Sequence, residues 1–235
     1  MNVRHLAPLL AAVLLAGCGN QPQQPDWQIN AHGAAERATA AYLTGNDRVA
    51  EQEWQRARAA LASTGRPQAL AQLELLRCAA RVASLAAAPC STFDALRADA
   101  SPEQAAYADY LAGQASAQQV ALLPPAQRAA ATNGQNLAAI AEPLPRLVAA
   151  GAALRAGRAS AATADLAIDT ASSQGWRRPL LAWLLLRAGQ ARAAGDDPLA
   201  QALERRIAIV ENAGTPGAYS PRPSTLPLTS TPYSE

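Results

Sequence analysis

The sequence contains no lysine, so all twenty of its basic residues are arginine. This absence excludes a lysine Schiff base, a Walker-type phosphate loop and a Ser-x-x-Lys acyl-enzyme site. Histidine is nearly as scarce, with two residues in 235, and there are three cysteines. Aromatic residues make up only 4% of the chain. These shortages remove most of the side chains on which common catalytic sites depend.

His32 is the only histidine beyond the first 17 residues. A Ser-His-Asp or Cys-His site would need it, and no Gly-x-Ser-x-Gly motif accompanies it. Zinc sites usually combine several cysteine and histidine ligands, which this chain does not supply. Asp165 and Asp169 lie one helical turn apart, but no other candidate ligands gather around them, so we interpret them as a solvated or arginine-paired edge. We therefore expect no catalytic residue, no metal site and no cofactor.

The charged residues are balanced and dispersed. The formal net charge is +2, and arginines alternate with carboxylates instead of forming a block. Nucleic-acid-binding domains usually carry a basic stripe or patch. We therefore expect no nucleic-acid partner.

The first 17 residues have the organisation of a secretory signal. Arg4 precedes an apolar run from Leu6 to Leu15, and Ala16 and Gly17 follow as small residues. The run is too short to span a bilayer, which requires about 20 apolar residues. The segment therefore predicts export from the cytoplasm.

The tetrapeptide Leu15-Ala16-Gly17-Cys18 resembles the lipobox of bacterial lipoproteins. The resemblance implies that residues 1–17 are cleaved as a signal peptide, that the Cys18 thiol receives a diacylglyceryl group, and that the new amino terminus is acylated. Gly19, in place of aspartate, favours the outer membrane by the sorting habit of that family. We expect the chain to be anchored in the inner leaflet, facing the periplasm. The alternative is an uncleaved helix or an ordinary secretory signal with a chance cysteine.

Alanine forms about a quarter of the chain, and β-branched residues never alternate over the length of a strand. This composition favours helices by intrinsic propensity and predicts an all-α fold with no sheet. We expect a Gln/Pro-rich tether over residues 18–30 and a helical domain over residues 31–212. Residues 213–235, which contain five prolines, are expected to form a disordered tail.

Helical periodicity is clearest on both sides of Gly45-Asn46. A first helix is expected from Ala31 to about Thr44, with Asn46 available to cap the next one. The second helix carries Ala50, Trp54, Ala57 and Leu61 at spacings of four, three and four. This spacing places these four side chains on one face.

This segment resembles a tetratricopeptide repeat, a 34-residue helix–turn–helix unit. The family keeps small or aromatic residues at positions that are occupied here by Ala38, Ala41, Ala50, Trp54 and Ala57. A second, weaker unit is centred on Gly157. The resemblance implies antiparallel hairpins stacked as an α-solenoid. A plain αα-hairpin would show much the same spacing and is the alternative.

Cys78 and Cys90 are the natural pair in an oxidising periplasm if Cys18 carries lipid. A helix from Pro67 to about Ala87 would carry the chain about 13 Å past Cys78, and three extended residues return only about 10 Å. A disulfide, with its Cα separation of ~5.5 Å, therefore requires an immediate reversal or a helix end near Ser84. Two buried thiols and a redox-active pair are the alternatives, although there is no Cys-x-x-Cys motif.

The leading functional hypothesis is a non-enzymatic envelope lipoprotein whose helical body is a scaffold for a partner protein or peptide. The expected partner-binding residues surround the start of an apolar helix: Trp176, Arg177, Trp183 and Arg187. The same segment, with Arg178, is the candidate site for an anionic glycan or lipid. A peptidoglycan-active enzyme would need a lone glutamate in an apolar pocket, and Glu74, Glu103 and Glu142 are all expected at the surface.

Overall fold

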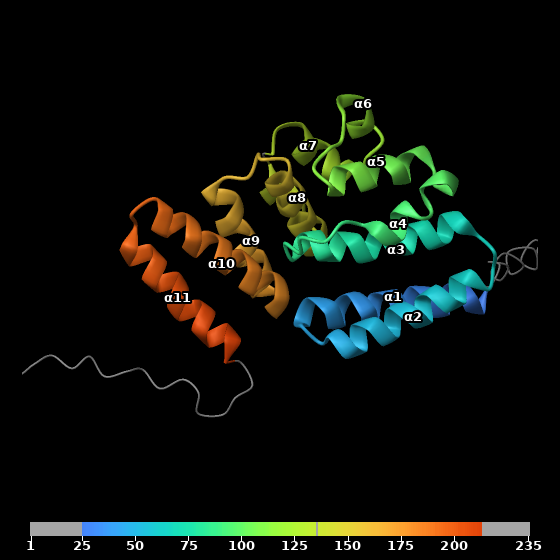
Figure 1. Ribbon diagram of the computed structural model, residues 1–235, viewed down its shortest axis with the longest axis horizontal. Helices are drawn as coiled ribbons and strands as arrows, with labels where there is room; N and C mark the ends of the chain where they lie inside the picture. The colour runs from blue at the N-terminus through green and yellow to red at the C-terminus, as the bar shows by residue number, and fades with distance from the viewer. Residues whose placement is uncertain (1–24, 135, 213–235) are drawn as a thin grey trace, which may run out of the picture.

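The computed structural model describes residues 25–134 and 136–212, and every regular element in this part of the chain is helical (Figure 1). The all-α prediction is confirmed. The predicted signal peptide, Cys18, most of the predicted tether and the predicted tail at 213–235 lie outside the described residues.

The first two helices form an antiparallel hairpin, α1 (Asp26–Thr44) and α2 (Asp47–Ala62). Gly45 turns the chain in the left-handed region, with φ +92°. The Asn46 side chain accepts a hydrogen bond of 3.4 Å from the Val49 N–H, which confirms it as the cap of α2.

Helix α1 begins five residues earlier than the sequence predicts. Residues 26–30, which were assigned to the tether, form its first turns, so that boundary is corrected. Trp27 supplies the reason, because its ring packs against the small hydrophobic cluster that α1, α2 and α3 share. Burying an aromatic ring stabilises the extra turns, and the Gln/Pro-rich composition around it hides this signal.

Helix α3 (Pro67–Ala83) ends earlier than predicted, before the left-handed Leu85 at φ +54°. A less regular segment follows, with short helices α4 (Ser91–Asp94), α5 (Pro102–Leu111), α6 (Ala117–Val120) and α7 (Pro125–Asn133). Helix α4 stops at Asp94, and a 3₁₀ turn follows at Arg97–Asp99. A second 3₁₀ turn, Leu137–Ala139, precedes the last group of helices.

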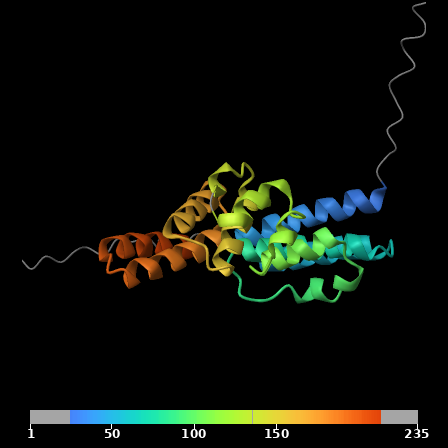
Figure 2. The same cartoon turned by 90° about the horizontal axis from the view of Figure 1, so that it is seen from above.

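The last group contains α8 (Pro143–Arg155), α9 (Ala161–Ser173), α10 (Arg177–Ala193) and α11 (Asp197–Glu211). Figures 1 and 2 both place α11 at one end of the described body and the start of α1 at the opposite end. The Asp196 side chain caps α11 by accepting a hydrogen bond of 3.1 Å from the Leu199 N–H.

The centre of the body is the crossing of α3 and α8, two helices that are far apart in the sequence. At Gly151 of α8, an added Cβ would overlap the carbonyl oxygen of Val82 in α3, so the two backbones are in direct contact. Helix α1 also contacts α10. In a solenoid each repeat contacts only its neighbours. The all-α fold is therefore shown, whereas these long-range contacts do not establish the predicted stacked solenoid.

Candidate functional site

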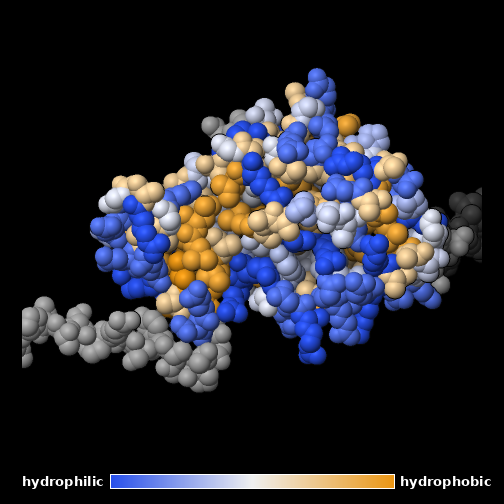
Figure 3. All heavy atoms as spheres, viewed as in Figure 1, coloured by the Kyte–Doolittle hydropathy of each residue, from blue (hydrophilic) through white to orange (hydrophobic). Residues whose placement is uncertain are grey.

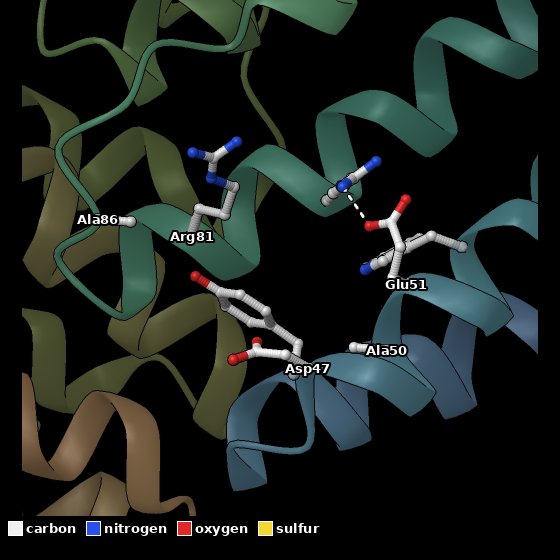
Figure 4. A pocket seen from close by; sticks show the side chains of 8 residues that line it. Asp47, Ala50, Glu51, Arg81 and Ala86 are labelled. Carbon is white, nitrogen blue, oxygen red and sulfur yellow. Dashed lines mark hydrogen bonds and ion pairs between the residues drawn. The ribbon is translucent and has the colours of Figure 1, made fainter.

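A cavity of about 370 Å³ opens where the end of α1, the first half of α2 and the second half of α3 meet (Figure 4). We call it the arginine cavity. Its lining residues are Tyr42, Asp47, Ala50, Glu51, Trp54, Arg77, Arg81 and Ala86.

Helical spacing explains why these side chains converge. Positions 47, 50, 51 and 54 of α2 recur at intervals of three and four and share one face, as do Arg77 and Arg81 of α3. Ala50 is only 3% exposed and Trp54 only 4%, and both belong to the cluster beneath the cavity. The charged groups therefore stand above an apolar base.

The two carboxylates of the arginine cavity are each paired with an arginine. The Arg77 Nη2 group donates to Glu51 Oε2 at 2.6 Å, the contact drawn as a dashed line in Figure 4. Arg178, from the start of α10, forms an ion pair with Asp47. Its Nε also donates to the Tyr42 carbonyl at 2.7 Å, and its guanidinium carbon lies 4.4 Å from the centre of the Tyr42 ring. Arg178 thus fixes the α1–α2 turn to the C-terminal helices.

Arg81 differs from its neighbours. Its side chain is half-buried and lines the cavity (Figure 4). Its guanidinium makes no ion pair or hydrogen bond with any residue of 25–134 or 136–212. Burial raises the pKa of Tyr42, and the nearby charges of Arg178 and Arg81 oppose this effect. The positive charge of Arg81 therefore favours the ionised form of the Tyr42 hydroxyl, against the larger effect of burial.

A second arginine lies beside the same wall of the cavity. Arg155 of α8 donates to the carbonyl oxygens of Ala86 at 2.6 Å and Leu111 at 3.1 Å. Burial lowers the pKa of Arg155, and the charge of Arg81 lowers it further. Arg155 is therefore held by two backbone carbonyls, one of which belongs to the cavity-lining Ala86.

The four residues expected to bind a partner do not form one surface. Trp183 is fully buried, and its indole N–H donates to the Ala83 carbonyl at 3.0 Å, so its assignment to a binding surface is corrected. Its helix is apolar on several sides, and the sequence does not indicate which side faces the core. Trp176 is half-buried and packs against the larger hydrophobic cluster.

The other two expected residues, Arg177 and Arg187, form hydrogen bonds between helices. Arg177 is exposed and donates to the carbonyls of Val210 at 3.1 Å and Glu211 at 3.2 Å, at the end of α11. The Arg187 Nε donates to Asp165 Oδ1 at 2.9 Å, which agrees with the predicted arginine-paired edge.

A second cavity, of about 310 Å³, lies beside this segment and includes Arg177, Arg178 and Leu185. Figure 3 shows apolar side chains gathered over α10 and α11, two helices that carry the exposed Leu185 and Ile209. This part of the surface combines apolar groups with arginine.

Glu74 is a further correction, because it was expected at the surface and is only 3% exposed. Arg58 of α2 covers it and pairs with its Oε1 atom, while its Oε2 atom is buried without a hydrogen-bond partner. Glu103 and Glu142 are exposed as predicted. The cavity at Glu74 is lined mainly by polar residues, Gln55, Arg58, Arg77, Ser91 and Thr92. It is not the apolar pocket with a lone glutamate that a peptidoglycan-active enzyme would need.

The sequence does not reveal the arginine cavity. Arg77 and Arg81 lie on α3, whereas Trp54 belongs to the apolar face that the spacing predicts for α2. Only the position of the α1–α2 hairpin against α3 brings these groups around one space. The i, i+4 spacing of Arg77 and Arg81 was the one available signal.

The described residues contain no group of three or more His, Cys, Asp or Glu side chains placed to hold a metal ion. None of the helices in this part of the chain is both long enough and apolar enough to cross a membrane. A scan against protein-family models and searches of curated proteins and of solved structures return no match to this chain.

Proposed function

We propose that this chain is a lipid-anchored protein of the bacterial cell envelope whose helical body binds a partner protein or peptide. In this proposal the body catalyses no reaction and takes no cofactor, and the bilayer is contacted through acylated Cys18. Tetratricopeptide-like hairpins and an outer-membrane location, facing the periplasm, are the finer parts of the same proposal.

The arginine cavity is the observation that carries the binding function. Its walls come from α1, α2 and α3, and Arg178 of α10 holds the rim at the α1–α2 turn. Arginine and aromatic residues are enriched among the side chains that dominate binding energies at protein interfaces. The proposed lipid anchor is supported by the lipobox-like tetrapeptide Leu15-Ala16-Gly17-Cys18.

The anchor is tested by growing cells that express the full chain with labelled palmitate and separating inner from outer membranes. We expect label on the wild-type chain in the outer membrane and none on the Cys18→Ser variant. Cys90→Ser, which keeps the lipobox-like cysteine, is the matched control and should retain the label. Label that survives Cys18→Ser would contradict the anchor.

The binding function is tested in cells with a photo-crosslinking residue in place of Ala86, at the wall of the arginine cavity. We expect one discrete crosslinked envelope protein or peptide, identified by mass spectrometry. The control places the same residue at Gln201, an exposed position on α11, and should not give that product. The same products from both positions, or none from either, would contradict the proposal.

A further inference from the structure

The starting observation is a half-buried charge without a counter-ion. Asp47 and Glu51 are paired with Arg178 and Arg77, whereas Arg81 has no partner within the described ranges. Removing a charge from water costs free energy unless another group compensates it. Because the local carboxylates are occupied, the structure leaves Arg81 available for a group from outside the chain.

The charge balance around the arginine cavity points to an anion. The groups that face or adjoin it are the two carboxylates of α2, the two guanidiniums of α3, Arg178 of α10 and Arg155 of α8. In and next to the cavity there are therefore four guanidinium groups and only two carboxylates. An anion bound at Arg81 would compensate the one guanidinium of the cavity lining that has no carboxylate partner among the described residues.

The residues that line the cavity favour a carboxylate over a phosphate as the bound anion. A planar guanidinium fork matches a carboxylate through two parallel hydrogen bonds. Asp47 and Glu51 stand in the same lining, and their charges oppose a doubly charged phosphate more than a singly charged carboxylate. Tyr42, Ala50 and Trp54 provide an apolar surface for the carbon atoms that carry the carboxylate.

We propose that Arg81 binds a carboxylate group of a peptide in the arginine cavity. The carboxylate comes from a peptide's C-terminus or from an acidic side chain within it. This inference rests on the proposed peptide-binding function and names the chemistry that the site recognises.

The test is calorimetric titration of the acylated full chain in detergent micelles with three short peptides and with inorganic phosphate. The peptides are acetyl-trialanine with a free C-terminus, the same peptide amidated, and an amidated acetyl-Ala-Glu-Ala. We expect binding of one or both carboxylate-bearing peptides and none of amidated trialanine. The two acidic peptides distinguish a terminal from a side-chain carboxylate. Phosphate that competes with equal or higher affinity would overturn the assignment.

Two variants link the binding to Arg81. Arg81→Met keeps most of the aliphatic stem and should weaken peptide binding by about tenfold or more, the effect expected for losing a charge-assisted pair. Arg48→Met, at an exposed arginine of α2 with no ion pair among the described residues, is the matched control and should bind like wild type. Equal binding by wild type and Arg81→Met would overturn the proposal.

The thermal midpoint of the free protein gives an independent readout. Removing an uncompensated charge beside Arg155 should leave the midpoint of Arg81→Met unchanged or raise it. A lower midpoint would show that Arg81 supports the fold and would contradict the site. If no peptide binds while the Ala86 crosslink to an envelope partner persists, the carboxylate site fails and the proposed scaffold function stands.

Discussion

The indole N–H of Trp183 in α10 donates a hydrogen bond of 3.0 Å to the carbonyl oxygen of Ala83, the last residue of α3. The last four carbonyls of a helix have no partner within that helix. Both residues are fully buried, so water cannot take the place of the indole. A side chain from the C-terminal part of the chain therefore completes the end of a helix formed one hundred residues earlier.

Trp183→Phe should destabilise the fold by about 1–3 kcal/mol, because it keeps an aromatic ring but leaves the buried Ala83 carbonyl unpaired. Trp183→Ala should cost more, about 3–5 kcal/mol, since it also creates a cavity. Urea unfolding followed by circular dichroism measures both values. Trp27→Phe, at a half-buried position, is the control and should cost less than Trp183→Phe. Equal losses for Trp27→Phe and Trp183→Phe would show that the Ala83 hydrogen bond contributes nothing.

Gly151→Ala should destabilise the protein by about 1–3 kcal/mol, because the added Cβ overlaps the Val82 carbonyl and forces α3 and α8 apart. Gly189→Ala is a matched control in a helix, where an added Cβ meets no atom within 4 Å. It should stabilise the protein by about 0.4–1 kcal/mol through reduced backbone entropy of the unfolded chain. Thermal unfolding measures both changes in stability. A change of the same sign in the two variants would contradict the close crossing of α3 and α8.

The structure joins Cys78 and Cys90 in a disulfide, with their Cα atoms 5.6 Å apart. The early end of α3 at Ala83 allows this closure, as the sequence geometry required. Closing a loop of this size stabilises a fold by about 3 kcal/mol through the unfolded state. We expect dithiothreitol to lower the thermal midpoint of wild type and to leave that of the Cys78→Ala/Cys90→Ala double variant unchanged. Two free thiols per chain, titrated in the unfolded protein before reduction, would exclude the bond.

Alkaline pH should destabilise the body through two tyrosines of α5. Burial raises the pKa of Tyr107 to about 12 and that of Tyr110 further, with Tyr107 adding to the second shift. An unfolded tyrosine ionises near pH 10. The stabilisation is therefore complete below pH 10 and is lost as the pH rises from 10 through 12. Urea unfolding at pH 8, 10 and 11 should show this fall in wild type and a smaller fall in Tyr107→Phe.

Tyr110→Phe separates titration from hydrogen bonding. The Tyr110 hydroxyl donates to the side-chain oxygen of buried Gln127 at 2.6 Å, so its loss should destabilise the body already at pH 8. Tyr107→Phe has no such bond to lose among the described residues and should be near wild type at pH 8. If both variants keep the full alkaline fall in stability, other groups are responsible for it.

Local signals in the sequence determined most of the helices. The alanine-rich composition, the Gly45-Asn46 turn and Pro67 at a helix start act within a few residues, and the structure follows them. Where a boundary was wrong, a distant contact decided it. Trp27 extends α1 because α2 and α3 offer its ring a place to pack.

Only the tertiary structure decided which helix faces are buried and which charges meet. The period of a helix identifies residues that share a face, but where alanine or leucine occurs on every side it does not identify the inner one. Trp183 is buried because its side of α10 packs against the end of α3. Glu74 is buried because Arg58 of α2 covers it. Arg81 was left without a partner because neighbouring arginines took the carboxylates within reach. That pairing depends on how α2, α3 and α10 pack in three dimensions.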